Sequence, residues 1–284
     1  MPYRIPLHDF KTWLNQFKQS LAQPPATPRV PFYIGQACVG SIEKGIAQRL
    51  VEAKYLNASP HAGAVILATP DMANAHTQIN QQLNGMAHWL QLQGLAAKWR
   101  DEQLPVTDFE TGALHGVVER AVIRVLGIRT FAVHLIGLRA DGAVWLQRRA
   151  LSKATDPGKL DTLVGGLVAA KEPFLTALER EAWEEAGIQL NRAETPIPFE
   201  KGGEFEVYCP IDTDIGGYMV ERCIWHIAYL PDTVMPENQD GEVSEFVCLN
   251  HEEIIARMLS GEVAGEAVLI LSRLLEKNRS LQQG

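Results

Sequence analysis

Apolar and polar positions follow two different periods along the chain, and the change between them divides it. In the first part, apolar residues recur every three or four positions, which predicts amphipathic helices. From about Gly127, runs rich in β-branched and aromatic residues predict strands instead. We therefore expect two domains, a smaller α/β domain at residues 1–126 and a strand-rich domain at residues 127–284.

In the first part, helices are predicted over residues 7–21, 42–56, 72–92 and 115–126, and short strands at 32–34 and 64–68. Ser41 is the expected N-cap of the second helix. In the second part, strands are predicted at 130–138, 143–149, 163–164, 202–209, 217–230 and 245–249, and helices at 251–259 and 266–276. The Asp141-Gly142 pair predicts a hairpin between the first two of these strands.

One stretch, GLVAAKEPFLTALEREAWEEAGI at positions 166–188, predicts a helix that follows a tight turn. Gly165 and Gly166 allow the backbone to turn sharply and to approach a ligand closely. Pro173 suits the first turn of the helix, and a carboxylate beside it meets the positive end of the helix dipole. Gly187 suits the C-terminal end, where a left-handed conformation is easiest for glycine.

Three glutamates of this helix, Glu181, Glu184 and Glu185, share one face that spans about 100°. Leu175, Leu178, Ala182 and Ala186 are expected to face the core on another flank. Three neighbouring like charges repel, so this face is either solvated or kept because divalent cations bind to it. Arg180 is expected to pair with a neighbouring glutamate and to orient it.

Composition limits the classes of function. The net charge of -8 over 284 residues argues against a broad basic surface for nucleic acid. The four cysteines form no CxxC pair, so we expect reduced thiols and no structural zinc. The sequence shows neither a secretory signal nor a membrane span, which favours a cytoplasmic protein. Complete P-loop, zincin and GxSxG motifs are also missing.

The spacing around the helix matches the signature GX5EX7REUXEEXGU, at Gly166, Glu172, Arg180, Glu181, Ala182, Glu184, Glu185, Gly187 and Ile188. The chain therefore resembles the Nudix hydrolases, although Ala182 is smaller than the usual aliphatic residue. The resemblance implies an α/β/α sandwich with a mixed sheet. It also implies cleavage of a diphosphate linked to another moiety with Mg²⁺ or Mn²⁺, with Glu181, Glu184 and Glu185 as metal ligands.

Other residues complete the expected site. Nudix enzymes often use a further acidic residue from a late loop, and Glu242 and Glu245 are preferred here over Asp240; a plain acidic turn stays the alternative. Arg148, Arg149, Lys153 and Lys159 form a basic cluster suited to a diphosphate, together with Gly165 and Gly166. Because side chains alternate along a strand, only one of Arg148 and Arg149 can face the site.

The flanking segments WLQRRALSKATDPGKLDTLVGG and PENQDGEVSEF resemble a Nudix subfamily associated with thiamine pyrophosphokinase, whose members carry an N-terminal domain of unknown function. This resemblance implies hydrolysis of thiamine diphosphate, especially of its oxidised forms, to the monophosphate. A broad hydrolase of ADP-sugars, dinucleotides or oxidised nucleotides is an alternative, and so is a non-hydrolytic ligand sensor. The N-terminal domain could close over the substrate or form a homodimer interface.

Overall fold

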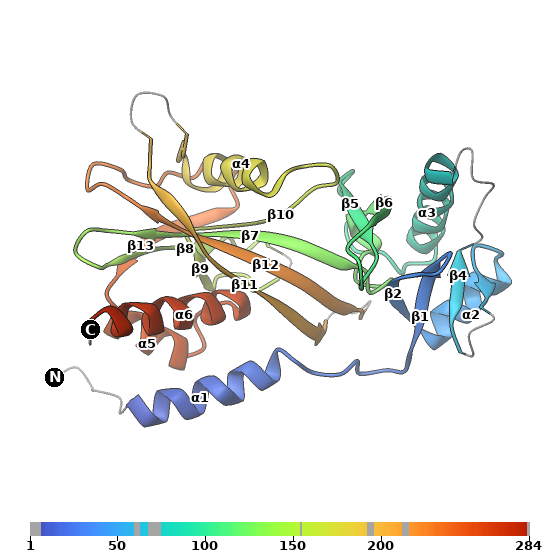
Figure 1. The fold of residues 1–284 in the computed structure, drawn as a ribbon, viewed down its shortest axis with the longest axis horizontal. Helices are drawn as coiled ribbons and strands as arrows, with labels where there is room; N and C mark the ends of the chain where they lie inside the picture. Colours follow the sequence, from blue (N-terminus) through green and yellow to red (C-terminus); the bar gives the residue numbers. More distant parts are fainter. Residues whose placement is uncertain are drawn as a thin grey trace.

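A computed structural model describes residues 7–59, 63–67, 75–153, 155–191, 196–211 and 216–282 (Figure 1). The predicted elements at 64–68 and 72–92 include residues 68 and 72–74, which lie outside the described residues. The elements are, in chain order, α1 Leu7–Ser20, β1 Arg29–Ile34, β2 Ala37–Glu43, α2 Lys44–Glu52, β3 Asn57–Ala58, β4 Val65–Leu67, α3 Ala75–Leu92, β5 Gln103–Thr107, β6 Leu114–Glu119, the 3-10 helix η2 Arg120–Val122, β7 Arg129–Leu138, β8 Val144–Arg149, β9 Leu160–Thr162, β10 Val164–Leu167, α4 Phe174–Ala186, β11 Phe199–Pro210, β12 Tyr218–Tyr229, β13 Val243–Leu249, α5 His251–Leu259 and α6 Gly265–Gln282.

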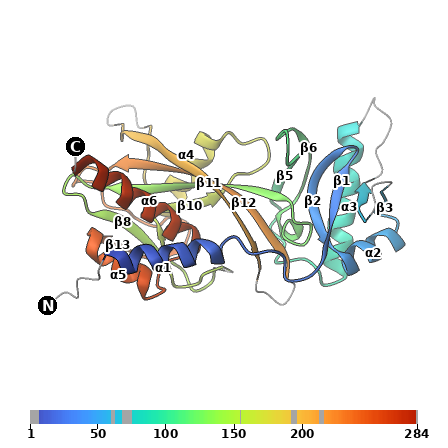
Figure 2. The same cartoon turned by 60° about the horizontal axis from the view of Figure 1, so that its bottom comes forward.

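The described strands after Gly127 form one seven-stranded sheet in the order β11-β12-β7-β8-β13, with β10 beside β7 and β9 beside β8. The sheet is mixed, because β12 runs parallel to β7 whereas β8 and β10 run antiparallel to it. Helix α4 covers one face, and α5, α6 and α1 cover the other (Figures 1 and 2). The expected α/β/α sandwich with a mixed sheet is confirmed.

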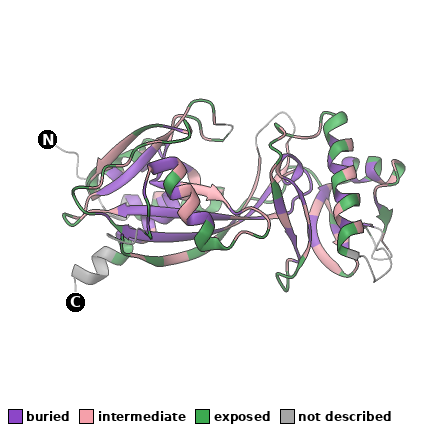
Figure 3. Ribbon diagram, turned by 90° about the horizontal axis from the view of Figure 1, so that it is seen from above, coloured by how far each residue is buried: buried purple, intermediate pink, exposed green. Residues whose placement is uncertain are grey.

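Neighbouring residues of β7 show how the sheet separates two apolar cores. Leu135 packs in the cluster that contains Ala182 of α4, whereas Ile136 packs in the cluster that contains Leu271 of α6. This follows from the alternation of side chains along a strand. Both residues are fully buried, and Figure 3 shows the central strands as largely buried. The sheet thereby becomes a rigid support for the segments at its edges.

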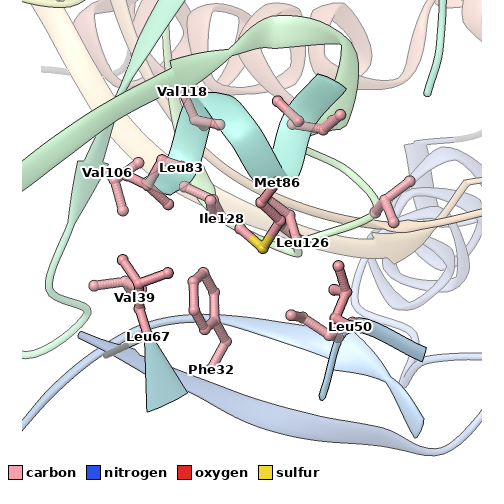
Figure 4. Packing of buried hydrophobic residues seen from close by; sticks show 14 of the residues in the cluster. Phe32, Val39, Leu50, Leu67, Leu83, Met86, Val106, Val118, Leu126 and Ile128 are labelled. Carbon is pink, nitrogen blue, oxygen red and sulfur yellow. The ribbon is translucent and has the colours of Figure 1, made fainter. Parts of the chain in front are cut away.

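The part of the chain before Gly127 has a sheet of its own, with the order β2-β1-β4-β3, and the separate hairpin β5-β6. Its core joins Phe32 of β1, Leu83 and Met86 of α3, and Ile128, which follows Gly127 (Figure 4). This smaller α/β unit is the one that the sequence predicted. No helix among the described residues is long and apolar enough to cross a membrane.

Helix α1 packs on the second part of the chain, although it belongs to the first part in sequence. Phe10 and Leu14 are buried in the same cluster as Leu271 of α6. A connector at residues 21–28 then leads to β1 in the other part. The expected division at Gly127 stays a prediction, and the structure adds that the chain's first helix packs on the part that follows Gly127.

Two of the predicted local features differ from the structure, which also has strands β2 and β5 where none was predicted. The helix expected at 115–126 is wrong, because this segment contains strand β6 and the short helix η2, and β6 pairs with β5. Ser41 lies within β2, and the N-cap of α2 is Glu43, which makes no side-chain cap bond. The hairpin at Asp141-Gly142 is confirmed, since β7 and β8 pair antiparallel and Gly142 has φ 84°.

Candidate active site

Helix α4 is fixed at both ends as its sequence predicts. Its N-cap is Pro173 in an extended conformation, and its C-cap Gly187 is left-handed with φ 65°. The N–H groups of Gly187 and Ile188 donate to the carbonyl oxygens of Trp183 and Ala182, both at 2.9 Å. These two bonds satisfy carbonyls that a helix end otherwise leaves unpaired. The glycine stop is confirmed, whereas Pro173, expected in the first turn, lies at the N-cap just before it.

The buried face of α4 differs from the expected one. The helix buries Ala177, Leu178, Ala182 and Ala186. Leu175, expected on this face, is 51% exposed. Glu185 is only 1% exposed, so one of the three glutamates lies within the apolar face. The acidic and apolar faces of the helix therefore meet at Glu185.

Arg180 joins the acidic side chains at the more exposed edge of this helix. Its Nη1 donates to Glu181 Oε1 at 2.7 Å and to Glu184 Oε2 at 3.0 Å, and its Nε donates to Glu172 Oε1 at 2.9 Å. The hydrogen bond from Arg180 holds the pKa of Glu172 below its ordinary value, and Glu172 raises the pKa of Arg180. The expected pairing of Arg180 with neighbouring glutamates is confirmed.

Strand β10 passes directly beside Glu181. A Cβ atom at Gly166 would lie 2.0 Å from Cδ of Glu181, which is closer than two carbon atoms that are not bonded can approach each other. The glycine is therefore needed for close approach. Burial raises the pKa of Glu181 above its ordinary value, while Arg180 acts in the opposite direction.

Glu185 connects α4 to two strands. Its Oε2 accepts a hydrogen bond from Gln147 Nε2 at 2.9 Å and another from the Gly165 N–H at 2.8 Å. Lys153 Nζ lies 3.5 Å from the other carboxylate oxygen. Burial raises the pKa of Glu185 to about 7 although Lys153 lowers it. A buried carboxylate of this kind is stabilised by any cation that reaches it.

Glu242 of the late acidic loop is connected to this cluster through Lys153. Lys153 pairs with Glu242 as well as with Glu185. Burial acts to raise the pKa of Glu242, but the hydrogen bond from Lys153 and nearby positive charge lower it overall. Glu245 pairs instead with Arg148 and is not brought to the cluster. Asp240 accepts a hydrogen bond from the Glu242 N–H at 2.8 Å and so fixes the turn.

The four basic residues are divided between two environments. Arg149 and Lys153 line a pocket beside β10, with Gly165 and Gly166. Arg148 pairs with Glu245 outside this lining, as expected if only one of the two adjacent arginines can face the site. Lys159 pairs with Asp156 at 2.7 Å and is also outside the lining.

The pocket has a volume of about 140 Å³ and is lined from both parts of the chain. Its lining includes charged and polar residues that sequence reasoning missed, namely Arg120, Arg124, His134, Asp156, Asp161, Glu221 and Glu266. Most of them come from different elements, so no spacing along the chain could reveal them. Only the glycine pair and the basic residues before it pointed to this place.

The carboxylates have the chemistry that a hard divalent cation requires, although the described residues contain no ready group of three His, Cys, Asp or Glu side chains that could hold a metal ion. Arg180 Nη1 lies between Glu181 and Glu184, 2.7 and 3.0 Å from one oxygen of each, where it stands in for a cation. Oxygen ligands are those that Mg²⁺ and Mn²⁺ prefer. Glu181, Glu184 and the neighbouring Glu185 are therefore the residues that would hold such an ion.

The second part of the chain is similar to proteins of one family. The NUDIX domain matches residues 128–269. Nudix hydrolase 24, chloroplastic, from Arabidopsis thaliana is 29% identical over 232 residues, which are 76% of this chain and 58% of that protein. Nudix hydrolase YfcD from Escherichia coli is 32% identical over 138 residues, which are 49% of this chain and 68% of that protein. The chain thus spans under two thirds of the length of the plant relative.

One solved structure that the chain matches is "Crystal Structure of DR0079 from Deinococcus radiodurans at 1.9 Angstrom Resolution". It has a TM-score of 0.49 and 24% sequence identity, and the match covers 61% of this chain and 98% of that chain.

Proposed function

The chain belongs to the Nudix hydrolase family, and from this premise we propose that it is a metal-dependent pyrophosphohydrolase that cleaves thiamine diphosphate, including oxidised forms, to the monophosphate. Nudix hydrolases generally use a divalent metal such as Mg²⁺ or Mn²⁺. The observation that supports hydrolysis best is the carboxylate cluster of α4. Arg180 holds Glu181 and Glu184 together, and Glu185 is buried beside them.

A bound divalent cation would lower the pKa of water and neutralise charge on the phosphate oxygens. The protein's own residues would do the rest. Gly165 and Gly166 let the backbone approach the diphosphate, and Lys153 and Arg149 offset its negative charge. A carboxylate of the cluster would take the proton from the attacking water, a step that contributes about 10² to 10⁴ in rate. Arg180 would act by positioning the carboxylates.

The choice of thiamine diphosphate has its own support, which lies outside the cluster. It comes from the resemblance of residues 145–166 and 236–246 to the thiamine-associated subfamily. These segments include Lys153, which contacts Glu185, and Glu242, which contacts Lys153. Two of the residues that carry the resemblance therefore lie beside the cluster that would cleave the diphosphate.

A panel of diphosphates assayed with Mg²⁺ tests the substrate. Thiamine diphosphate and its oxidised forms are expected to be cleaved faster than ADP-ribose or NADH, as phosphate release would show. Faster cleavage of the nucleotides would replace this proposal by a broad nucleotide hydrolase. Release of phosphate from none of them would favour a ligand sensor.

Two substitutions test the cluster itself. Glu184→Gln or Glu185→Gln is expected to lower turnover by about 10²-fold or more, because each removes a negative charge needed at the proposed metal site. Glu179→Gln is the matched control, since Glu179 lies on the same helix but contacts Asn191. Far-UV circular dichroism checks the fold of each variant. Near wild-type turnover in both test variants would contradict the metal-site assignment.

A further inference from the structure

Arg120 reaches the pocket beside β10 from the part of the chain before Gly127. It is the first residue of η2, and it lines the pocket. Its side chain is 40% exposed. The other lining cations in the described part of the chain are less exposed, with 27% for Arg124, 18% for Lys153 and 15% for Arg149. Arg120 is therefore the lining cation most open to an incoming anion.

The backbone around Arg120 is held by hydrogen bonds to one buried carboxylate. Glu119 caps η2 by accepting from the Ala121 N–H at 3.3 Å. The same carboxylate accepts from the N–H groups of Arg100 at 3.0 Å and Glu102 at 3.1 Å. The Arg120 N–H donates in turn to the Glu102 carbonyl oxygen at 2.8 Å. The segments that carry Arg100 and Arg120 are thus fixed to each other.

Two contacts place these segments directly against the site. The Ala170 N–H, between β10 and α4, donates to the Gln103 carbonyl oxygen of β5 at 2.9 Å. Figure 1 shows β5 and β6 beside the end of β7 that leads to this turn. On the other side of Arg120, Arg124 forms an ion pair with Glu221 of β12 at 2.7 Å. Arg120 therefore lies between two points of attachment to the domain that carries the carboxylate cluster.

The ion pair of Arg120 can be given up more readily than that of Arg149. Asp161, the partner of Arg149, is buried, so separating those two would leave a buried carboxylate uncompensated. Glu102, the partner of Arg120 at 2.7 Å, is partly exposed and lies outside the pocket lining. Exposed ion pairs contribute little to stability. Arg120 is thus able to leave Glu102 for another anion.

Positive charge from the first part of the chain already acts on the acidic residues of the site. Burial raises the pKa of Glu242, but Lys153 and then the positive charges of Arg100 and Arg120 lower it overall. Arg100 is exposed, and no carboxylate among the described residues forms an ion pair with it. Two arginines from before Gly127 therefore add positive potential where the pocket meets the late acidic loop.

We propose that Arg120 exchanges Glu102 for a phosphate oxygen when the substrate binds, so that the part of the chain before Gly127 completes the diphosphate site. A guanidinium donates two parallel hydrogen bonds to a phosphate, which suits arginine to this exchange. Arg100 strengthens the attraction through its charge. The inference rests on the proposed function, because it concerns the diphosphate that the cluster would cleave.

Direct binding to the full chain tests this exchange without requiring turnover. The probe is methylenediphosphonate, a diphosphate analogue whose P–C–P bridge is not hydrolysed, titrated by calorimetry in the presence of Mg²⁺. It has no organic part, so the result does not depend on the choice of thiamine diphosphate. Arg120→Gln should weaken its binding at least about tenfold, because charge-assisted hydrogen bonds to the phosphate are lost.

Two further variants separate a binding role from a structural one. Glu102→Gln breaks the same ion pair from the other side, and it should bind the probe at least as tightly as wild type because Arg120 is freed. Arg222→Gln is the matched control, since Arg222 is 41% exposed, pairs with Glu204 at 2.6 Å and lies outside the pocket lining. It makes the same change of charge and should leave the affinity unchanged. Urea unfolding checks the fold of each variant.

The outcomes keep this inference apart from the proposed function. The exchange is overturned if Arg120→Gln weakens binding by less than about tenfold, if Glu102→Gln weakens it, or if Arg222→Gln weakens it as much as Arg120→Gln. The absence of binding by the wild type overturns it as well. Hydrolysis of thiamine diphosphate with kcat and KM unchanged in Arg120→Gln overturns the exchange but leaves the function. The expected pattern of binding without hydrolysis of any diphosphate overturns the function but leaves the exchange.

Discussion

Glu266→Gln is expected to stabilise the protein at high pH and not at low pH. Burial, and then the negative charge of Glu221, raise the pKa of Glu266 from its ordinary 4.5 to about 7. The groups that face it are the carboxylates Glu221, Asp161 and Asp156, the cations Arg120, Arg124, Arg149 and Lys153, and the neutral His134. A carboxylic acid whose pKa is raised by folding makes the folded state less stable once it ionises.

The sign and size follow from proton linkage. Between pH 4.5 and about 7 the folded state binds this proton more tightly than the unfolded state, so stability falls as pH rises through that window. The full effect corresponds to about 3 kcal/mol, and most of it develops between about pH 5 and pH 8.5. Glutamine does not titrate, so the variant escapes this loss. Its stability relative to wild type should therefore rise by about 2 to 3 kcal/mol between the two pH values.

Urea unfolding at both pH values, followed by tryptophan fluorescence, measures this difference. Comparing two pH values cancels the pH-independent cost of the substitution itself. Glu266→Ala should differ from Glu266→Gln by a constant offset and show the same change with pH. If the Gln variant and the wild type keep the same difference in stability at both pH values, Glu266 is not a buried titrating group and this reasoning is wrong.

Two further substitutions test close contacts. Gly166→Ala should lower turnover by about 10²-fold or more, because its Cβ would lie 2.0 Å from Cδ of Glu181 and would displace that side chain. Phosphate release measures turnover, and the circular dichroism spectrum should be unchanged. Glu119→Ala should lower the free energy of unfolding by about 3 kcal/mol, since the buried carboxylate accepts from three backbone N–H groups, those of Arg100 at 3.0 Å, Glu102 at 3.1 Å and Ala121 at 3.3 Å. Denaturant unfolding would show it, and an unchanged midpoint would contradict it.

The elements that the sequence predicted correctly are those decided by neighbouring residues. The hairpin at Asp141-Gly142 and the ends of α4 at Pro173 and Gly187 depend on backbone conformations that a few residues impose by themselves. The ion pairs of Arg180 likewise depend on helical spacing, since Glu184 is one turn away. Local rules were sufficient for this part of the site.

The errors arose where distant segments decide the structure. Residues 115–126 have the apolar content of a helix, but Val118 pairs with Leu104 on β5 and becomes part of a sheet. Glu185 was expected on an acidic face with Glu181 and Glu184. It is buried because Gln147 of β8 and Gly165 of β10 supply hydrogen bonds that make burial of its carboxylate tolerable. Neither partner is near it in sequence.

The same distinction separates the motif on α4 from the pocket beside it. The carboxylates that would assist cleavage lie within one short helix, so their arrangement could be predicted from spacing. The pocket beside β10 instead combines Arg124, from before Gly127, with His134 of β7 and Glu266 of α6. Because these positions are far apart in sequence, each can change without altering the motif on α4. The motif therefore indicates the reaction, whereas the proposed substrate rests on the segments 145–166 and 236–246 that flank it.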